Sequence, residues 1–198
     1  MYPESLKKLI ENFKIFPGIG EKTAERLAFS VLDMESEQID FFSKNLLDVK
    51  NNIKKCASCN IITEKTICDI CSDKLRENKT LCIVEDSKYA ILIEKLGVFN
   101  GRYHVLDGLI SPLDGINPED IGLEKLIDRI LKEKFGEIII AFKPTIEGET
   151  TALYIKKILS DINVKVTKLA SGLPIGVDME YVDSLTLESA LKDRKVIE

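Results

Sequence analysis

The sequence lacks a hydrophobic run long enough to cross a membrane. Its longest strongly apolar stretch covers residues 138–142, whereas a transmembrane helix needs about 20 apolar residues. The first eight residues contain an acid, Glu4, and no long apolar core, so we expect no signal peptide. We therefore predict a cytoplasmic protein, in which thiols stay reduced and paired cysteines indicate a metal site more than disulfides.

The sequence also lacks a surplus of basic residues. It has 28 Lys and Arg against 33 Asp and Glu, which gives a net charge of −5. Residues 1–55 alone are balanced, with nine residues of each sign. A protein that binds DNA tightly by itself usually carries a basic surplus. Any DNA contact is therefore expected to be local and modest, or to be built up by several copies of the chain.

No nucleotide-binding P-loop is present, and His104 is the only histidine. The Gly-rich segment at residues 16–28 has Glu21 between Gly20 and Lys22 and lacks the four-residue spacer between glycines. Because a P-loop needs Gly directly before Lys and Ser or Thr, we reject ATP binding at this segment. His104 lies in an expected strand, and we interpret it as a strand residue, not as a metal ligand or a general base.

Two kinds of hydrophobic pattern divide the chain. Residues 3–55 repeat apolar side chains at three- and four-residue spacing, which predicts helices. Beyond residue 80, short apolar runs alternate with helical stretches, which predicts a parallel sheet covered by helices. The expected strands are 81–84, 103–106, 137–142 and 164–169, and the expected helices are 87–96, 118–135, 149–160 and 185–192. The fold class is therefore an α+β protein of several modules.

Four of the five cysteines form two close pairs. Cys56 and Cys59 are separated by two residues, eight residues follow, and Cys68 and Cys71 repeat the spacing. Two such pairs can place four thiolates around a tetrahedral zinc ion. We predict one structural zinc per chain, with no open coordination position; two disulfides or free buried thiols are the alternatives. Cys82 lies outside this spacing and is interpreted as a buried apolar residue.

The Gly-rich segment is typical of a helix-hairpin-helix. Gly18 and Gly20 allow a tight turn that exposes N–H groups at the start of a helix, where they can bind a DNA phosphate without reading sequence. Lys22 and Arg26 are four residues apart, so they share a helix face and can flank that phosphate. The alternative is a plain helix–loop–helix with a solvated charged face.

Acidic residues follow two of the expected strands. Glu85 comes directly after one, and Glu147 and Glu149 belong to the loop after another. The pattern resembles a Toprim domain, whose catalytic members have acids at the first and third positions of this loop to hold magnesium. Here those positions are Lys143 and Thr145, so magnesium binding is doubtful and metal-assisted DNA cleavage is not expected. The three glutamates either bind a partner or only cap a helix and solvate a loop.

Taken in order, these features resemble the RecR family of bacterial recombination proteins over nearly the whole chain. The matching stretches are residues 16–29, residues 56–72, Ile-Ser-Pro-Leu-Asp-Gly-Ile at 110–116 and Pro-Thr-Ile-Glu-Gly-Glu at 144–149. The resemblance implies a helix-hairpin-helix domain (1–54), a four-cysteine zinc module (55–79), a Toprim domain (80–174) and a tail with a Walker B-like strand and a helix (175–198). It also implies a ring-shaped homotetramer that can encircle DNA, formed by exchange of terminal segments.

The same resemblance implies a non-enzymatic DNA-binding mediator in DNA repair. With RecO, and with RecF in many bacteria, such proteins help to load RecA onto single-stranded gaps. Lys22 and Arg26 would contact single- or double-stranded DNA, and Glu85, Glu147 and Glu149 would lie on the face that engages RecO or DNA.

The sequence departs from the RecR family pattern at two positions, and two other functions remain as alternatives. The family commonly has Asn where Lys143 stands and Gly where Val177 stands, so Lys143 could add a DNA contact and the tail turn could be stiffer. A Toprim-type nuclease or primase-like enzyme is one alternative function. A zinc-stabilised scaffold that binds only proteins is the other.

Overall fold

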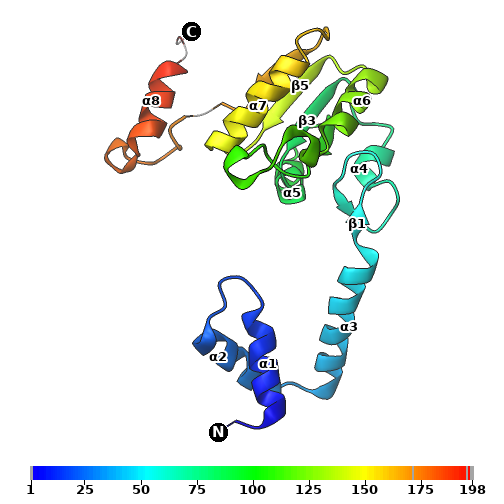
Figure 1. Ribbon diagram of the computed structural model, residues 1–198, viewed down its shortest axis with the longest axis vertical. Coiled ribbons are helices and arrows are strands. Elements are labelled where there is room, and N and C mark those ends of the chain that lie inside the picture. The colour runs from blue at the N-terminus through cyan, green and yellow to red at the C-terminus, as the bar shows by residue number, and fades with distance from the viewer. Residues whose placement is uncertain (1, 171, 195, 197–198) are drawn as a thin grey trace. The chain divides into compact units, whose positions relative to one another are not determined.

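The computed structural model describes residues 2–170, 172–194 and 196. The chain forms two compact units, Met1–Ile53 and Lys54–Glu198, whose elements are labelled in Figure 1. Among the described residues, no helix combines the length and the hydrophobicity needed to span a bilayer.

The first unit contains three helices, α1 (Glu4–Lys14), α2 (Glu21–Leu32) and α3 (Ser36–Asn52). The pair α1 and α2 encloses a small core of Leu6, Ile10, Ala24 and Ala28. Ala24 and Ala28 are fully buried, and their small side chains let the two helices approach closely. This packing positions the turn at residues 15–20 that joins them.

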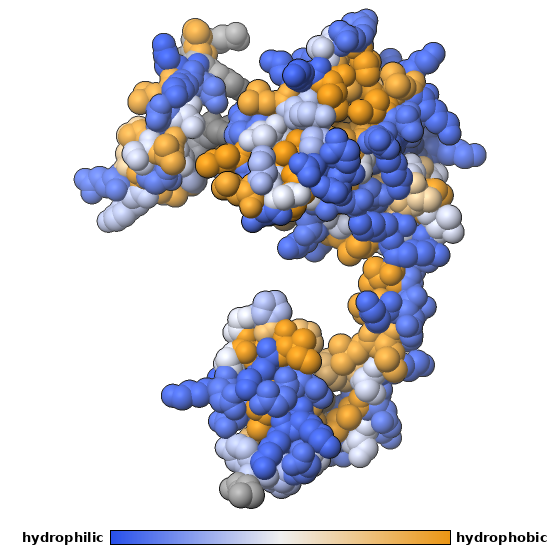
Figure 2. Space-filling view, viewed as in Figure 1, coloured by the Kyte–Doolittle hydropathy of each residue, from blue (hydrophilic) through white to orange (hydrophobic). Residues whose placement is uncertain are grey.

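The helix α3 has an apolar stripe that the described residues of its own unit leave unburied. None of its residues is buried, and Figure 2 shows hydrophobic side chains on its surface. The stripe repeats at alternating three- and four-residue spacing, which is the pattern of helices that pair. Its members are Ile39, Phe42, Leu46 and Val49 of the helix and the C-cap residue Ile53, at 37–59% exposure.

The second unit is built on a four-stranded sheet with the order β4-β3-β5-β6. All three strand pairs are parallel, so the predicted parallel sheet is confirmed. The strands are β3 (Thr80–Val84), β4 (Arg102–Val105), β5 (Glu137–Ala141) and β6 (Lys165–Lys168). The connecting helices are α5 (Ser87–Leu96), α6 (Leu123–Glu133) and α7 (Ile146–Ile158).

The two faces of the sheet are buried against different elements. Leu81 and Ile83 of β3 share one core cluster with residues of α6 and α7. Cys82 and Val84, which alternate with them, share a second cluster with Ala90 of α5 and three of the paired cysteines. The cysteine module therefore shares a hydrophobic core with the sheet, and the buried position of Cys82 agrees with its interpretation as an apolar residue.

Two helix starts differ from the sequence-based expectation. The helix expected at 118–135 is divided, because η2 (Pro118–Ile121) is a 3-10 turn and Gly122, at φ 70°, separates it from α6. The helix expected from residue 149 begins earlier, at Ile146, because the Thr145 hydroxyl accepts a hydrogen bond from the Gly148 N–H at 3.2 Å and caps it.

Short elements complete the unit. The cysteine module contains the hairpin of β1 (Lys54–Lys55) and β2 (Ile62–Thr63) and the turn of helix α4 (Asp69–Ser72). Two further 3-10 turns are η1 (Pro112–Asp114) and η3 (Met179–Tyr181), and the last helix is α8 (Ser184–Lys192). Asp183 caps α8, which has no buried residue. In the turn before it, the positive φ of 81° falls on Gly176, so Val177 does not need to be glycine.

Candidate functional site

The four paired cysteines converge on one point. The Sγ atoms of Cys56, Cys59, Cys68 and Cys71 all lie within 4.8 Å of one another, and those of Cys59 and Cys68 are 3.5 Å apart. A tetrahedral zinc site with Zn–S bonds of about 2.3 Å separates its sulfurs by about 3.8 Å. None of the five cysteines forms a disulfide. The donor set and its spacing therefore fit a four-thiolate zinc ion.

The cysteines of the cluster shift one another's pKa in opposite directions, and contacts with Cys68 and Cys71 raise the pKa of Cys59. Hydrogen bonds from the Cys59 and Cys68 thiols lower the pKa of Cys71 to about 3, and the charge of Arg129 acts in the same direction. The Cys68 N–H lies 3.3 Å from the Cys56 sulfur as a further donor. Arg129 belongs to α6 and is only 6% exposed, so the sheet unit itself supplies a cation that offsets thiolate charge.

Hydrogen bonds tie the cysteine module to the sheet. Asn60 follows the first cysteine pair in a left-handed conformation, at φ 63°, and its Nδ2 donates to the Val105 carbonyl at 3.0 Å. Lys125 Nζ donates to Asn60 Oδ1 at 2.6 Å. At the end of the module, the Arg102 guanidinium donates to the Asp73 carbonyl at 2.8 Å. The module is therefore fixed to β4 and α6.

The Gly-rich turn has the geometry that a helix-hairpin-helix requires. Gly18 has a φ of 80°, a conformation that L side chains rarely adopt, and no atom lies within 4 Å of where its Cβ would be. Gly20 is the N-cap of α2, and no side chain caps the helix there. The first N–H groups of an α-helix have no partner within the helix, so those of α2 are free to donate to an anion.

Lys22 and Arg26 stand on the exposed surface of α2, one turn apart. Among the described residues, neither forms an ion pair, whereas Lys14 pairs with Glu21 at 2.7 Å and with Glu11 at 2.9 Å. The carboxylate of Glu21 is thereby occupied. The structure thus brings the predicted Gly18, Gly20, Lys22 and Arg26 onto the hairpin and the first two turns of α2.

Glu85 and Lys143 meet at the carboxyl edge of the sheet. Glu85 follows β3 and Lys143 follows β5, and these strands are neighbours with Val84 opposite Ala141. The Lys143 ammonium lies 3.2 Å from Glu85 Oε1. This contact raises the pKa of Lys143.

The other two glutamates of the predicted set lie apart from Glu85. Glu149 accepts hydrogen bonds from Lys168 at 3.0 Å. Glu147 lies in the first turn of α7, where its own N–H and the Thr145 hydroxyl lower its pKa. In the part of the chain that the structure describes, the paired cysteines form the only group of three or more potential metal ligands. The three glutamates therefore do not come together as one group of ligands in the described part of the chain.

Gly148 allows the segment after β5, at Lys143, to lie close to the start of α7. A Cβ at this position would lie 2.1 Å from the Lys143 carbonyl oxygen, which no side chain tolerates. The glycine therefore holds the residues that follow β5 tightly against the start of α7.

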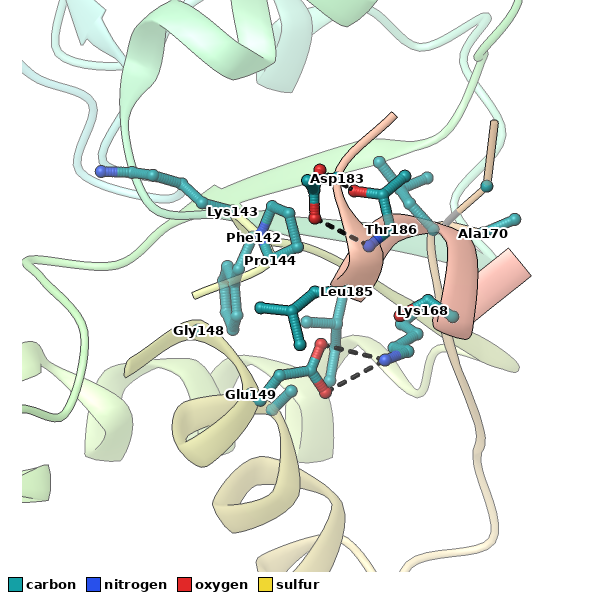
Figure 3. Close-up of a pocket in the computed structure, with 15 residues that line it drawn as sticks. Phe142, Lys143, Pro144, Gly148, Glu149, Lys168, Ala170, Asp183, Leu185 and Thr186 are labelled. Carbon is teal, nitrogen blue, oxygen red and sulfur yellow. Dashed lines mark hydrogen bonds and ion pairs between the residues drawn. The ribbon is translucent and has the colours of Figure 1, made fainter. Parts of the chain in front are cut away.

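A groove of about 590 Å³ runs from this edge of the sheet to α8. Leu185 of α8 points into it, and Glu149 and Lys168 form an ion pair along its wall (Figure 3). Lys143 lines the groove with its backbone end, while its ammonium points away from the other labelled residues (Figure 3). Leu185 remains 74% exposed, so α8 only partly fills the groove.

Four family models together match most of the chain. In chain order they describe the RecR helix-hairpin-helix at residues 6–50, the RecR zinc finger domain with four cysteines at 53–73, the Toprim domain at 79–170 and the RecR C-terminal region at 172–195. A Recombination protein RecR of Staphylococcus haemolyticus (strain JCSC1435) is 49% identical over 193 residues, which are 98% of each chain. The chain belongs to the RecR family. The Recombination protein RecR of Staphylococcus aureus (strain JH9) is 48% identical over the same share.

Membership of the RecR family confirms the resemblance and the fold class. The helix-hairpin-helix, the four-cysteine module and the Toprim domain were all predicted from their motifs, and the family models match each of them. Three residues of this site were not predicted from the sequence. Asn60 and Arg102 connect the cysteine module to the sheet through hydrogen bonds, and Arg129 offsets the negative charge of the cysteines. An Asn directly after a Cys-x2-Cys pair was the one available signal, because Asn tolerates left-handed backbone.

Proposed function

We propose that this chain binds DNA without sequence preference and acts as a non-enzymatic mediator in recombinational DNA repair. With RecO, and with RecF where it is present, it would help to load RecA onto gapped single-stranded DNA in the cytoplasm. Full-length similarity to two recombination proteins carries this proposal. We also propose the boundaries of its four parts: the helix-hairpin-helix domain at 1–54, the zinc module at 55–79, the Toprim domain at 80–174 and the tail at 175–198.

The DNA contact is assigned to the start of α2. Its uncapped N–H groups and helix dipole favour a phosphate oxygen. Lys22 and Arg26 are exposed there and have no carboxylate partner among the described residues. Such contacts position a protein on the DNA backbone without reading bases. A single contact of this kind is weak, which agrees with the balanced charge of the chain.

The cysteine cluster is assigned to one structural zinc ion per chain. Its ligands would be Cys56, Cys59, Cys68 and Cys71, whose sulfurs lie within 4.8 Å of one another. Four protein ligands complete a tetrahedral shell. The ion would supply folding free energy, with no open position for water or substrate.

A catalytic role for the Toprim domain is disfavoured by its charges. A magnesium-dependent nuclease or primase-like enzyme needs several carboxylates around its metal. Here the ammonium of Lys143 lies at Glu85, and the ammonium of Lys168 lies at Glu149. We therefore assign Glu85, Glu147 and Glu149 to the surface that faces RecO or DNA.

A homotetrameric ring would combine several weak DNA contacts. The apolar stripe of α3 and the exposed Leu185 and Leu191 of α8 offer two surfaces for association between copies. Linked sites bind the same strand with an avidity above that of any single site. The ring therefore reconciles DNA binding with a net charge of −5.

The proposal is tested by removing the two cations together. Lys22→Ala with Arg26→Ala should abolish DNA binding at moderate salt while the oligomer stays intact. Lys44→Ala with Lys50→Ala, on α3 of the same unit, removes the same charge and should leave most of the binding in place. Unchanged DNA binding by the first variant would show that the hairpin is not the DNA contact and would favour a scaffold that binds only proteins.

A further inference from the structure

A buried carboxylate lies at the place where sheets of this type bind ligands. Along the sheet the strand order reverses between β3 and β5, and open α/β sheets bind ligands at the carboxyl ends beside such a reversal. The Glu85 side chain, directly after β3, is only 6% exposed. Its Oε1 atom accepts no hydrogen bond from a described residue. A buried charged oxygen is costly without a cation, so this position requires one.

Lys143 supplies that cation from the neighbouring strand. Its Nζ lies 3.2 Å from Glu85 Oε1, and its main-chain N–H donates to Oε2 at 3.4 Å. Both oxygens of the carboxylate therefore face one residue. The Gly148 contact described above holds the backbone of Lys143 against α7, which fixes the point from which its side chain extends.

Further carboxylates lie within reach of the same charge. The pKa of Asp86 is lowered, first by the Lys88 N–H that its carboxylate accepts and also by Lys143. The charge of Lys143 also contributes to the lowered pKa of Glu147, after the Glu147 N–H and the Thr145 hydroxyl. The charge of Lys143 therefore acts on acids from two separate segments, and Asp86 is also paired with Lys88 at 3.3 Å.

We propose that Lys143 is an internal cation that replaces a divalent metal ion at the Glu85 edge of the Toprim sheet. The site is then closed to magnesium because an ammonium already neutralises its buried carboxylate. Replacing Lys143 by a neutral residue opens a position for a divalent cation with Glu85 as a ligand. This exclusion of a divalent cation does not depend on whether the chain binds DNA.

The test titrates Mn²⁺ into the full-length, zinc-loaded protein and follows free Mn²⁺ by electron paramagnetic resonance. Lys143→Asn should bind one Mn²⁺ per chain at least about tenfold more tightly than the wild type, a difference of about 1.4 kcal/mol. Glu85→Gln with Lys143→Asn should lose that site. Equal Mn²⁺ affinity in wild type and Lys143→Asn would overturn the proposal.

Thermal unfolding gives a second readout with a matched control. Lys143→Asn should melt a few degrees below the wild type, and Mn²⁺ should raise its melting temperature while leaving the wild type unchanged. Lys165 pairs with Glu137 at the same distance of 3.2 Å, but at the opposite end of β5. Lys165→Asn should therefore neither bind Mn²⁺ nor respond to it. A Lys143→Asn protein that keeps the wild-type melting temperature and binds no Mn²⁺ would also reject the internal cation.

Discussion

The main-chain N–H of Val105 donates a hydrogen bond of 2.8 Å to the carbonyl oxygen of Cys59. This bond joins the end of β4 to the first cysteine pair. Cys56, Cys59 and Cys68 also share a hydrophobic cluster with Cys82 and Val84 of β3 and with Tyr103 and Val105 of β4. The cysteine cluster and the sheet are therefore parts of one folded core, and the loss of one should weaken the other.

Loss of the metal should therefore destabilise the Toprim sheet as well as the cysteine module. Cys59→Ser should reduce the zinc content well below one ion per chain. It should lower the melting temperature by on the order of 10 °C, because the free energy of metal binding contributes to folding. Elemental analysis and calorimetry measure the two effects. Cys82→Ala is the control, since it removes a buried thiol of the same core and should leave zinc at one per chain. A Cys59→Ser protein with normal zinc content would reject the ligand assignment.

The buried histidine makes stability depend on pH. Burial lowers the pKa of His104 from 6.5 to about 3, and the charges of Arg129 and Lys125 add to this shift. A base whose pKa is depressed in the folded state stabilises the protein above the unfolded pKa. That contribution is lost as the pH falls from about 6.5 toward 3, because the unfolded chain then binds the proton more strongly.

The corresponding test compares the wild type with His104→Gln, which cannot titrate. Between pH 6.5 and pH 5.5 the wild type should lose about 1 kcal/mol more unfolding free energy than the variant. Denaturant unfolding at each pH measures the difference. The comparison cancels the loss of zinc that acid causes in both proteins. Parallel pH profiles would mean that His104 is protonated or solvated in the folded state.

Local motifs and long-range pairings differed in how well they could be predicted. The four cysteines and the hairpin glycines lie within short segments, so spacing alone identified them. The contact between Glu85 and Lys143 depends on β5 lying beside β3 rather than beside β4, which no local pattern records. The divided helix before residue 123 was missed for a related reason, because the apolar spacing continues across Gly122 although its φ of 70° ends the turn. Asn60 reaches Val105 across 45 residues of sequence, so its role emerges only with the sheet.

The salt dependence of DNA binding should show how many phosphate contacts the hairpin makes. Each phosphate contact contributes about 0.9 to the slope of log affinity against log salt on duplex DNA. Lys22→Ala with Arg26→Ala should therefore reduce that slope by about 1 for every chain in contact, at low salt where residual binding is still measurable. Fluorescence anisotropy at several salt concentrations measures it. Lys44→Ala with Lys50→Ala should keep the wild-type slope, so a loss shared by both variants would point to a diffuse charge effect instead of a phosphate site.

The stripe on α3 should control assembly. Leu46 is 50% exposed and Val49 is 59% exposed, and a stripe with this heptad spacing is stabilised by pairing with a second helix. If copies of the chain pair through α3 and through α8, breaking one interface should convert the proposed tetramer into a dimer. Leu46→Asp with Val49→Asp places two carboxylates in the stripe, where burial without partners is costly. Asn45→Asp with Asn51→Asp adds the same charge to α3 outside the stripe and should leave the tetramer intact. Light scattering after size exclusion measures both masses, and an unchanged mass for the first variant, with helix content preserved, would exclude α3 from the interface.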